Sequence, residues 1–159
     1  MRIAVLLAFL GIFSVPGKAQ SQTQEERNKA VARNFFEEVL DQGHLEKYVD
    51  SHASDFVAHA GDHDAGLVED MAAAREERKA LPDMHVTVNQ VLAEGDSVVV
   101  YWRASGTNTG EGMGFPASGK RIAVPGMTIF RFRQGKISEE WSVFDMSSAM
   151  QQAGLCVPK

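Results

Sequence analysis

The chain has 159 residues, 44% hydrophobic and 23% charged, which is enough for one domain with its own core. Its net charge of −5 at pH 7 disfavours nucleic acid and anionic membrane surfaces as partners. The only cysteine is Cys156, so no disulfide can form within the chain. The sequence has no zinc-type Cys/His pattern and no phosphate-binding glycine loop after a strand, and we expect no cofactor.

The N-terminus has the pattern of a signal peptide. Arg2 supplies a positive charge, Ile3–Val15 is an apolar run, and small residues precede a cleavage position after Ala19. The run is too short to span a bilayer, and no second one follows it. We therefore expect residues 1–19 to be removed and residues 20–159 to form one exported domain, periplasmic or secreted.

Two helices are predicted next. The segment 23–26 fits a capping box, and the helix after it should run to about Asp41, with Gly43 as its stop. Its apolar stripe consists of Val31, Phe35, Phe36 and Val39. Leu45, Tyr48 and Val49 indicate a short second helix.

The segment 56–59 is predicted to be a short strand that carries His59 near its end, and residues 60–66 are predicted to be a polar loop. His59 and His63 are spaced as metal ligands are on a helix. Two glycines nearby disfavour a helix at this point, so we expect no metal site.

Residues 67–81 are predicted to form a strong helix that Pro82 ends. Its charged residues are expected to point outward into solvent; they are Glu69, Arg75, Glu76, Glu77, Arg78 and Lys79.

From residue 84 to residue 145 the chain is predicted to form a four-stranded antiparallel meander with a glycine-rich crossing loop at 106–119. On the second of these strands, Trp102 shares one face with Val98 and Val100. The Pro125-Gly126 pair predicts a bulge or bend in the third strand. A curved sheet that wraps round helices is an α+β arrangement with a pocket at its open end.

The last hairpin turns at Gln134-Gly135. Strict alternation places Glu139, Trp141 and Asp145 on one face of its second strand, with Ile137 and Val143. A carboxylate on an apolar wall has a raised pKa and can serve as an acid or base near neutral pH. Alternatively, Asp145 caps the helix predicted at 146–153, and Glu139 lies at an exposed edge.

The order of several motifs resembles the SnoaL-like polyketide cyclase (ester cyclase) family of the NTF2-like superfamily. These motifs are Phe35-Phe36, the segment 56–59, Leu81-Pro82-Asp83-Met84-His85-Val86, Gly106-Thr107-Asn108-Thr109-Gly110, the segments 116–120 and 135–141, and the closing Asp145. Within the fourth motif, Asn108 stands where the family often has histidine.

The resemblance implies an NTF2-like (cystatin-like) α+β barrel, in which a curved antiparallel sheet wraps round a long N-terminal helix and encloses an apolar pocket. It also implies a homodimer through the outer sheet face. The family's cyclases close a ring by intramolecular aldol condensation without metal or cofactor, using an aspartate near the end of the last strand. By position, the acid/base would be Asp145, and the family's histidine after the first strand would be His59.

Two functions follow from these expectations. The first is an exported ester cyclase-type enzyme that performs acid/base chemistry on a small apolar carbonyl compound. Its pocket walls would include Trp102, Phe132, Glu139 and Trp141. The second is an exported module that binds a small ligand or a partner in the same fold without chemistry. The tryptophans could equally be core residues, and His59 could be a hydrogen-bonded histidine at a strand end.

Overall fold

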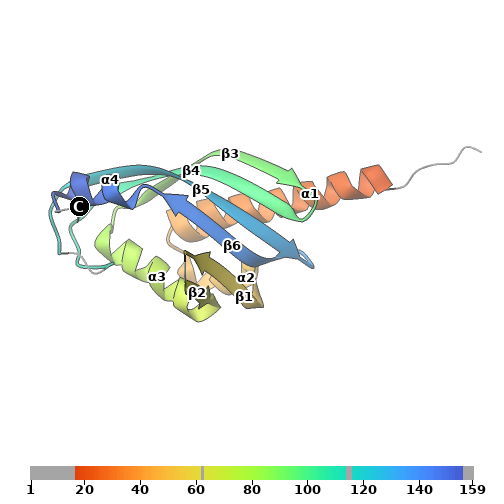
Figure 1. Cartoon of the computed structure of the whole chain (residues 1–159), viewed down its shortest axis with the longest axis horizontal. Helices are drawn as coiled ribbons and strands as arrows, with labels where there is room; N and C mark the ends of the chain where they lie inside the picture. The colour runs from red at the N-terminus through yellow and green to blue at the C-terminus, as the bar shows by residue number, and fades with distance from the viewer. Residues whose placement is uncertain (1–16, 62, 114–115, 156–159) are drawn as a thin grey trace, which may run out of the picture.

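The computed structural model describes residues 17–61, 63–113 and 116–155 and shows a curved six-stranded sheet packed along a long helix (Figure 1). The predicted α+β class is confirmed. The elements are α1 (Gly17–Asn34), the π-helix η1 (Phe35–Asp41), the 3-10 helix η2 (Leu45–Lys47), α2 (Tyr48–Ser51), β1 (His52–Ala60), β2 (His63–Gly66), α3 (Leu67–Ala80), β3 (His85–Glu94), β4 (Ser97–Thr107), β5 (Arg121–Arg133), β6 (Lys136–Phe144) and α4 (Met146–Ala153).

The first helix starts earlier than predicted. Helix α1 is already helical at Gly17, the first described residue, and runs through the capping box predicted at 23–26, because neither glycine nor proline interrupts residues 18–42. It continues into η1, which ends at Asp41 as predicted, and its buried Phe35, Phe36 and Val39 face the sheet. Most of the predicted signal peptide lies outside the described residues, so export stays a prediction.

The sheet has the order β2-β1-β6-β5-β4-β3. The predicted meander is confirmed as β3 to β6, and β1 adds to it in parallel beside β6. The expected loop at 60–66 is instead the β1–β2 hairpin, in which His59 pairs with Asp64. No helix among the described residues is long and apolar enough to cross a membrane.

Of the bulge or bend predicted at Pro125 and Gly126, the bulge is absent, since the β4–β5 register continues through both residues. The glycine is needed because a Cβ at position 126 would lie 2.2 Å from the Trp102 ring. Pro125 lies just beyond Gly126, the last β5 residue paired with β6, so its missing N–H removes no bond from that ladder.

A bulge does occur in β6, one residue before the two glutamates. Phe132 pairs with Ile137 and Arg131 with Glu139, which leaves Ser138 as an extra residue. The extra residue reverses the predicted faces of the strand. Glu139, Trp141 and Val143 lie on the outer face, whereas Glu140, Ser142 and Phe144 pair with Phe130, Thr128 and Gly126 on the inner face.

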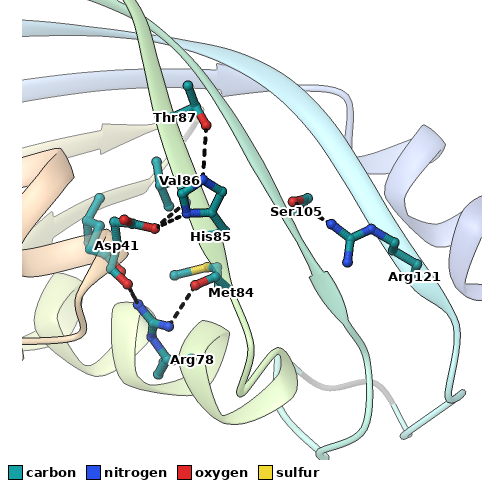
Figure 2. A network of polar contacts seen from close by, with 9 residues as sticks. Asp41, Arg78, Met84, His85, Val86, Thr87, Ser105 and Arg121 are labelled. Carbon is teal, nitrogen blue, oxygen red and sulfur yellow. Dashed lines mark hydrogen bonds and ion pairs between the residues drawn. The ribbon is translucent and has the colours of Figure 1, made fainter.

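A polar network joins η1, α3 and the start of β3 (Figure 2). The Arg78 guanidinium donates to the Met84 carbonyl at 2.9 Å and to the Asp41 carbonyl at 2.6 Å. The Asp41 carboxylate accepts from the Val86 amide at 2.6 Å and contacts His85 Nδ1 at 2.7 Å. Arg78 therefore points inward, contrary to the prediction, and fixes the helices to the edge strand.

The crossing loop is fixed by buried Asn108. Its side-chain amide donates to the carbonyls of Ala80 and Gly110, and its oxygen accepts from the Ser118 amide at 3.0 Å. A Cβ at Gly110 would lie 1.9 Å from the Lys79 carbonyl oxygen, so only glycine allows this close approach. The loop thus packs against the C-terminal end of α3.

Candidate active site

Two adjoining cavities lie between the helices and the inner face of the sheet. The main cavity, of about 300 Å³, is lined by Phe35, Phe36, Leu40, Tyr48, Ala58, His59, Ala60, Asp70, Ala73, Ala74, Glu77, Met84, Val86, Trp102, Ala104, Thr128, Glu140, Ser142 and Phe144. The side cavity, of about 100 Å³, lies under α4 and shares Glu77, Met84, Trp102, Ala104 and Phe144 with it.

Three carboxyl groups enter the main cavity. Asp70 and Glu77 come from α3, where a spacing of seven residues places them on one face two turns apart. Glu140 comes from β6, and the bulge at Ser138 turns it inward. Among the described residues, none of the three pairs with a lysine or arginine, and no such residue lines either cavity.

Burial without a cation shifts all three groups toward the protonated form. Burial raises the pKa of Glu140 to about 8; the Asp70 charge adds to the shift and the hydrogen bond from Ser142 opposes it. Burial and the Asp70 charge raise the pKa of Glu77 to about 7. The pKa of Asp70 is also raised by burial, against the hydrogen bond from Tyr48. A pKa of 7 to 8 suits proton transfer near neutral pH.

Tyr48 positions Asp70. Its hydroxyl donates to Asp70 Oδ2, and burial raises the pKa of Tyr48, so the phenol keeps its proton. Its ring is held by stacking on His52, with centroids 4.5 Å apart, and by an edge contact with Phe35 at 4.9 Å. The phenol is therefore a fixed donor on the cavity wall.

The two cavities differ in polarity. The side cavity has an apolar wall that includes Met84, Met113, Met146 and Met150, and methionine side chains adapt to ligands of different shapes. The main cavity combines the carboxyl groups with the aromatic rings of Phe36, Trp102 and Phe144. Together they fit a small molecule with a polar end and a short apolar end.

Asp145 does not lie on the wall of either cavity. It is exposed, and its carboxylate accepts from the Ser148 amide at 2.9 Å as the N-cap of α4. The predicted placement on a pocket wall is wrong because the bulge shifts the strand's alternation. The alternative placement, as a helix cap, is confirmed.

His59 lies at the edge of the main cavity, where its ring is 27% exposed. Nδ1 is 2.8 Å from Asp64 and Nε2 is 3.2 Å from Glu139, and the ring stacks on Trp141 with centroids 4.5 Å apart. Hydrogen bonds to these two carboxylates raise the pKa of His59. His59, Glu139 and Trp141 thus form one cluster, but the latter two belong to the outer face and not to the cavity.

Of the predicted pocket walls, Trp102 lines both cavities, whereas Phe132 is a core residue, 3% exposed, outside them. Sequence reasoning missed the inward positions of Asp70, Glu77 and Glu140. The Glu139-Glu140 pair was a usable signal, since alternation turns one of two adjacent residues inward in either register. Among the described residues, no group of three or more His, Cys, Asp or Glu is arranged to hold a metal.

A curved sheet on a long helix, with a partly polar internal cavity, defines an α+β domain with an internal pocket. The family model for SnoaL-like polyketide cyclases matches residues 30–153, so the chain belongs to the SnoaL-like polyketide cyclase family. The structures discussed next share the NTF2-like architecture that the sequence resemblance implied.

Three solved structures illustrate the similarity. A Jannaschia sp. CCS1 protein provisionally assigned as a SnoaL-like polyketide cyclase has a TM-score of 0.76 and 24% identity, covering 84% of this chain and 95% of its own. AclR of Streptomyces galilaeus, provisionally assigned as a hydroxylase, has a TM-score of 0.75 and 24% identity, covering 82% of this chain and 97% of its own. IdmH of Streptomyces antibioticus, provisionally assigned as a polyketide cyclase, has a TM-score of 0.70 and 26% identity, covering 80% of this chain and 99% of its own. No curated protein sequence matches the chain.

Proposed function

We propose that this protein is a cofactor-independent acid/base enzyme that acts on a small, mostly apolar carbonyl compound, by aldol-type cyclisation or a related proton transfer. The observation that carries the proposal is Glu140, a carboxyl group in the wall of the main cavity whose pKa burial raises to about 8. Membership of the polyketide cyclase family supports the same type of chemistry.

In the proposed reaction, the Glu140 carboxylate takes a proton from a carbon next to a carbonyl group. The electron pair of that C–H bond forms a new bond to a second carbonyl carbon in the same molecule. The second oxygen becomes an alkoxide and takes up a proton, which Glu140 returns, so the cycle needs no external reagent. A protonated Glu77, whose pKa is raised to about 7, can donate a hydrogen bond to an oxygen on which negative charge develops.

Charge and volume restrict the substrate. Three carboxyl groups and the absence of lysine and arginine from the described lining disfavour an anionic compound. A dry cavity of about 150 Å³ accommodates benzene, so the main cavity has room for a larger ring system. The side cavity, at about 100 Å³, has room for a short alkyl substituent. We expect a neutral or cationic carbonyl compound with one such substituent.

The test is a panel of neutral, cationic and anionic carbonyl compounds, matched in size, screened by thermal stabilisation and then by turnover. Neutral or cationic members should raise the Tm more than their carboxylate analogues. Turnover should pass through a maximum between about pH 7 and pH 8, because the reaction needs Glu140 ionised and Glu77 protonated, and the pKa values of these groups are about 8 and about 7. Binding without turnover would contradict the proposed enzymatic function and favour a module that binds a ligand without chemistry.

A further inference from the structure

A chain of three hydrogen bonds crosses the wall of the main cavity from one strand to the next. Trp102 Nε1 on β4 donates to Thr128 Oγ1 on β5 at 2.9 Å. Thr128 Oγ1 is 2.5 Å from Ser142 Oγ on β6. Ser142 Oγ donates to Glu140 Oε1 at 2.8 Å. The four residues come from three neighbouring strands, so these hydrogen bonds exist together only in the folded sheet.

The Trp102 indole, at one end of this series of hydrogen bonds, determines which group is the donor in each bond. An indole N–H can only donate, so Thr128 Oγ1 must accept from it. Thr128 is 1% exposed, and Ser142 is the only further partner of its hydroxyl among the described residues. The Thr128 proton is therefore donated to Ser142, and the Ser142 proton is left for Glu140.

One oxygen of Glu140 is thereby occupied whether or not the group is ionised. Oε1 accepts from Ser142 in both states, and the C=O oxygen of a carboxylic acid is a better acceptor than its O–H oxygen, so this bond favours the proton on Oε2. The hydrogen bond also favours the ionised form and opposes the effect of burial.

We infer that Trp102, Thr128 and Ser142 are positioning residues that fix the Glu140 carboxyl group and reserve its Oε2 oxygen for proton exchange with the ligand. This inference rests on the proposed role of Glu140 as the acid/base. It adds a function for Thr128 and Ser142, which the sequence did not single out.

The test is a titration of Glu140 by NMR in protein labelled with [¹³C]glutamate, with its signal assigned through a Glu140→Gln variant. Ser142→Ala removes the last donor and should raise the pKa of Glu140 by about one unit, which is the usual effect of losing one hydrogen bond to a carboxylate. Thr128→Val removes the middle hydroxyl and should raise the pKa in the same direction. Thr128→Ser keeps the hydroxyl and should restore the wild-type titration.

Thr87→Val, at an exposed position of β3, is the matched control and should leave the titration unchanged. Ser142→Ala changes an exposed side chain, so it keeps the test valid if Thr128→Val proves unstable. If the pKa of Glu140 in Ser142→Ala, or in folded Thr128→Val, equals that of the wild type, the inference is wrong. Because the titration needs no turnover, this failure is distinct from failure of the proposed function, which a fully active Glu140→Gln variant would show.

Discussion

His52 is a buried histidine at the start of β1, only 3% exposed. Its Nδ1 lies 2.9 Å from the Tyr48 carbonyl, and its ring contacts Phe35 and Phe56 edge-on. Burial lowers the pKa of His52 to about 4 from the ordinary value of 6.5. Protonation of His52 therefore makes the stability of the structure around Tyr48 depend on pH.

The sign of this linkage follows from the lowered pKa. Between pH 6.5 and 4 the unfolded chain takes up a proton that the folded chain does not, so stability is lost as the pH falls through this window. His52→Gln removes the titration and should reduce the loss by roughly 2–3 kcal/mol. Urea unfolding at pH 7 and pH 4.5 measures it. Equal losses in both proteins would show that His52 does not cause the acid sensitivity.

At the scale of elements, α4 supplies hydrogen-bond partners to the part of β5 that lies beyond the end of β6. Gln152 Oε1 accepts from the Ala123 amide at 2.8 Å, and its Nε2 donates to the Ala123 carbonyl at 3.1 Å. The side-chain amide thus takes the place of a strand residue. It also holds α4 over the side cavity, to which Met150 and Ala153 contribute.

Gln152→Ala should therefore lower the free energy of unfolding by about 1–2 kcal/mol, because two backbone groups of Ala123 lose their partner. It should also speed hydrogen exchange of the Ala123 amide and weaken binding of ligands with an apolar substituent. Gln151→Ala, at the exposed neighbouring position, is the control. Equal exchange rates at Ala123 in the two variants would contradict this role of Gln152.

Most elements could be predicted from sequence because their signals are local. The last hairpin turns at Gln134-Gly135 as predicted, with positive φ at both residues, and α4 has the predicted bounds. The Ser138 bulge has no local signal, since it depends on how β6 pairs with β5 and β1. One unpredicted residue moved Glu140 into the cavity and Glu139 out of it. Glu77 was likewise predicted to face solvent because its sequence neighbours are charged.

At the scale of the whole molecule, the outer face of the sheet carries a row of apolar side chains. Leu92, Val99, Ile129 and Trp141 form one row across four strands. Leu92 is 56% exposed and Ile129 44% exposed. A contiguous apolar face of this kind marks an interaction surface. We propose that a second copy of the chain covers it, which is the homodimer expected from the family resemblance.

Ile129→Glu places a charge at the centre of this row and should convert the dimer into a monomer, because a buried unpaired charge is costly. Light scattering coupled to size-exclusion chromatography measures the mass. Val68→Glu, at a position of α3 that is 81% exposed, should leave the dimer intact. A monomeric wild-type protein at micromolar concentration would contradict the proposal.

The central claim, that Glu140 rather than Asp145 is the acid/base, is tested most directly by comparing Glu140→Gln with Asp145→Asn. Both variants keep the side-chain shape. Gln at 140 can still accept from Ser142 but cannot exchange a proton, so turnover of any confirmed substrate should fall by about 10²- to 10⁴-fold. Asn at 145 still caps α4 and should keep both turnover and Tm. Full turnover in Glu140→Gln together with a large loss in Asp145→Asn would contradict the claim.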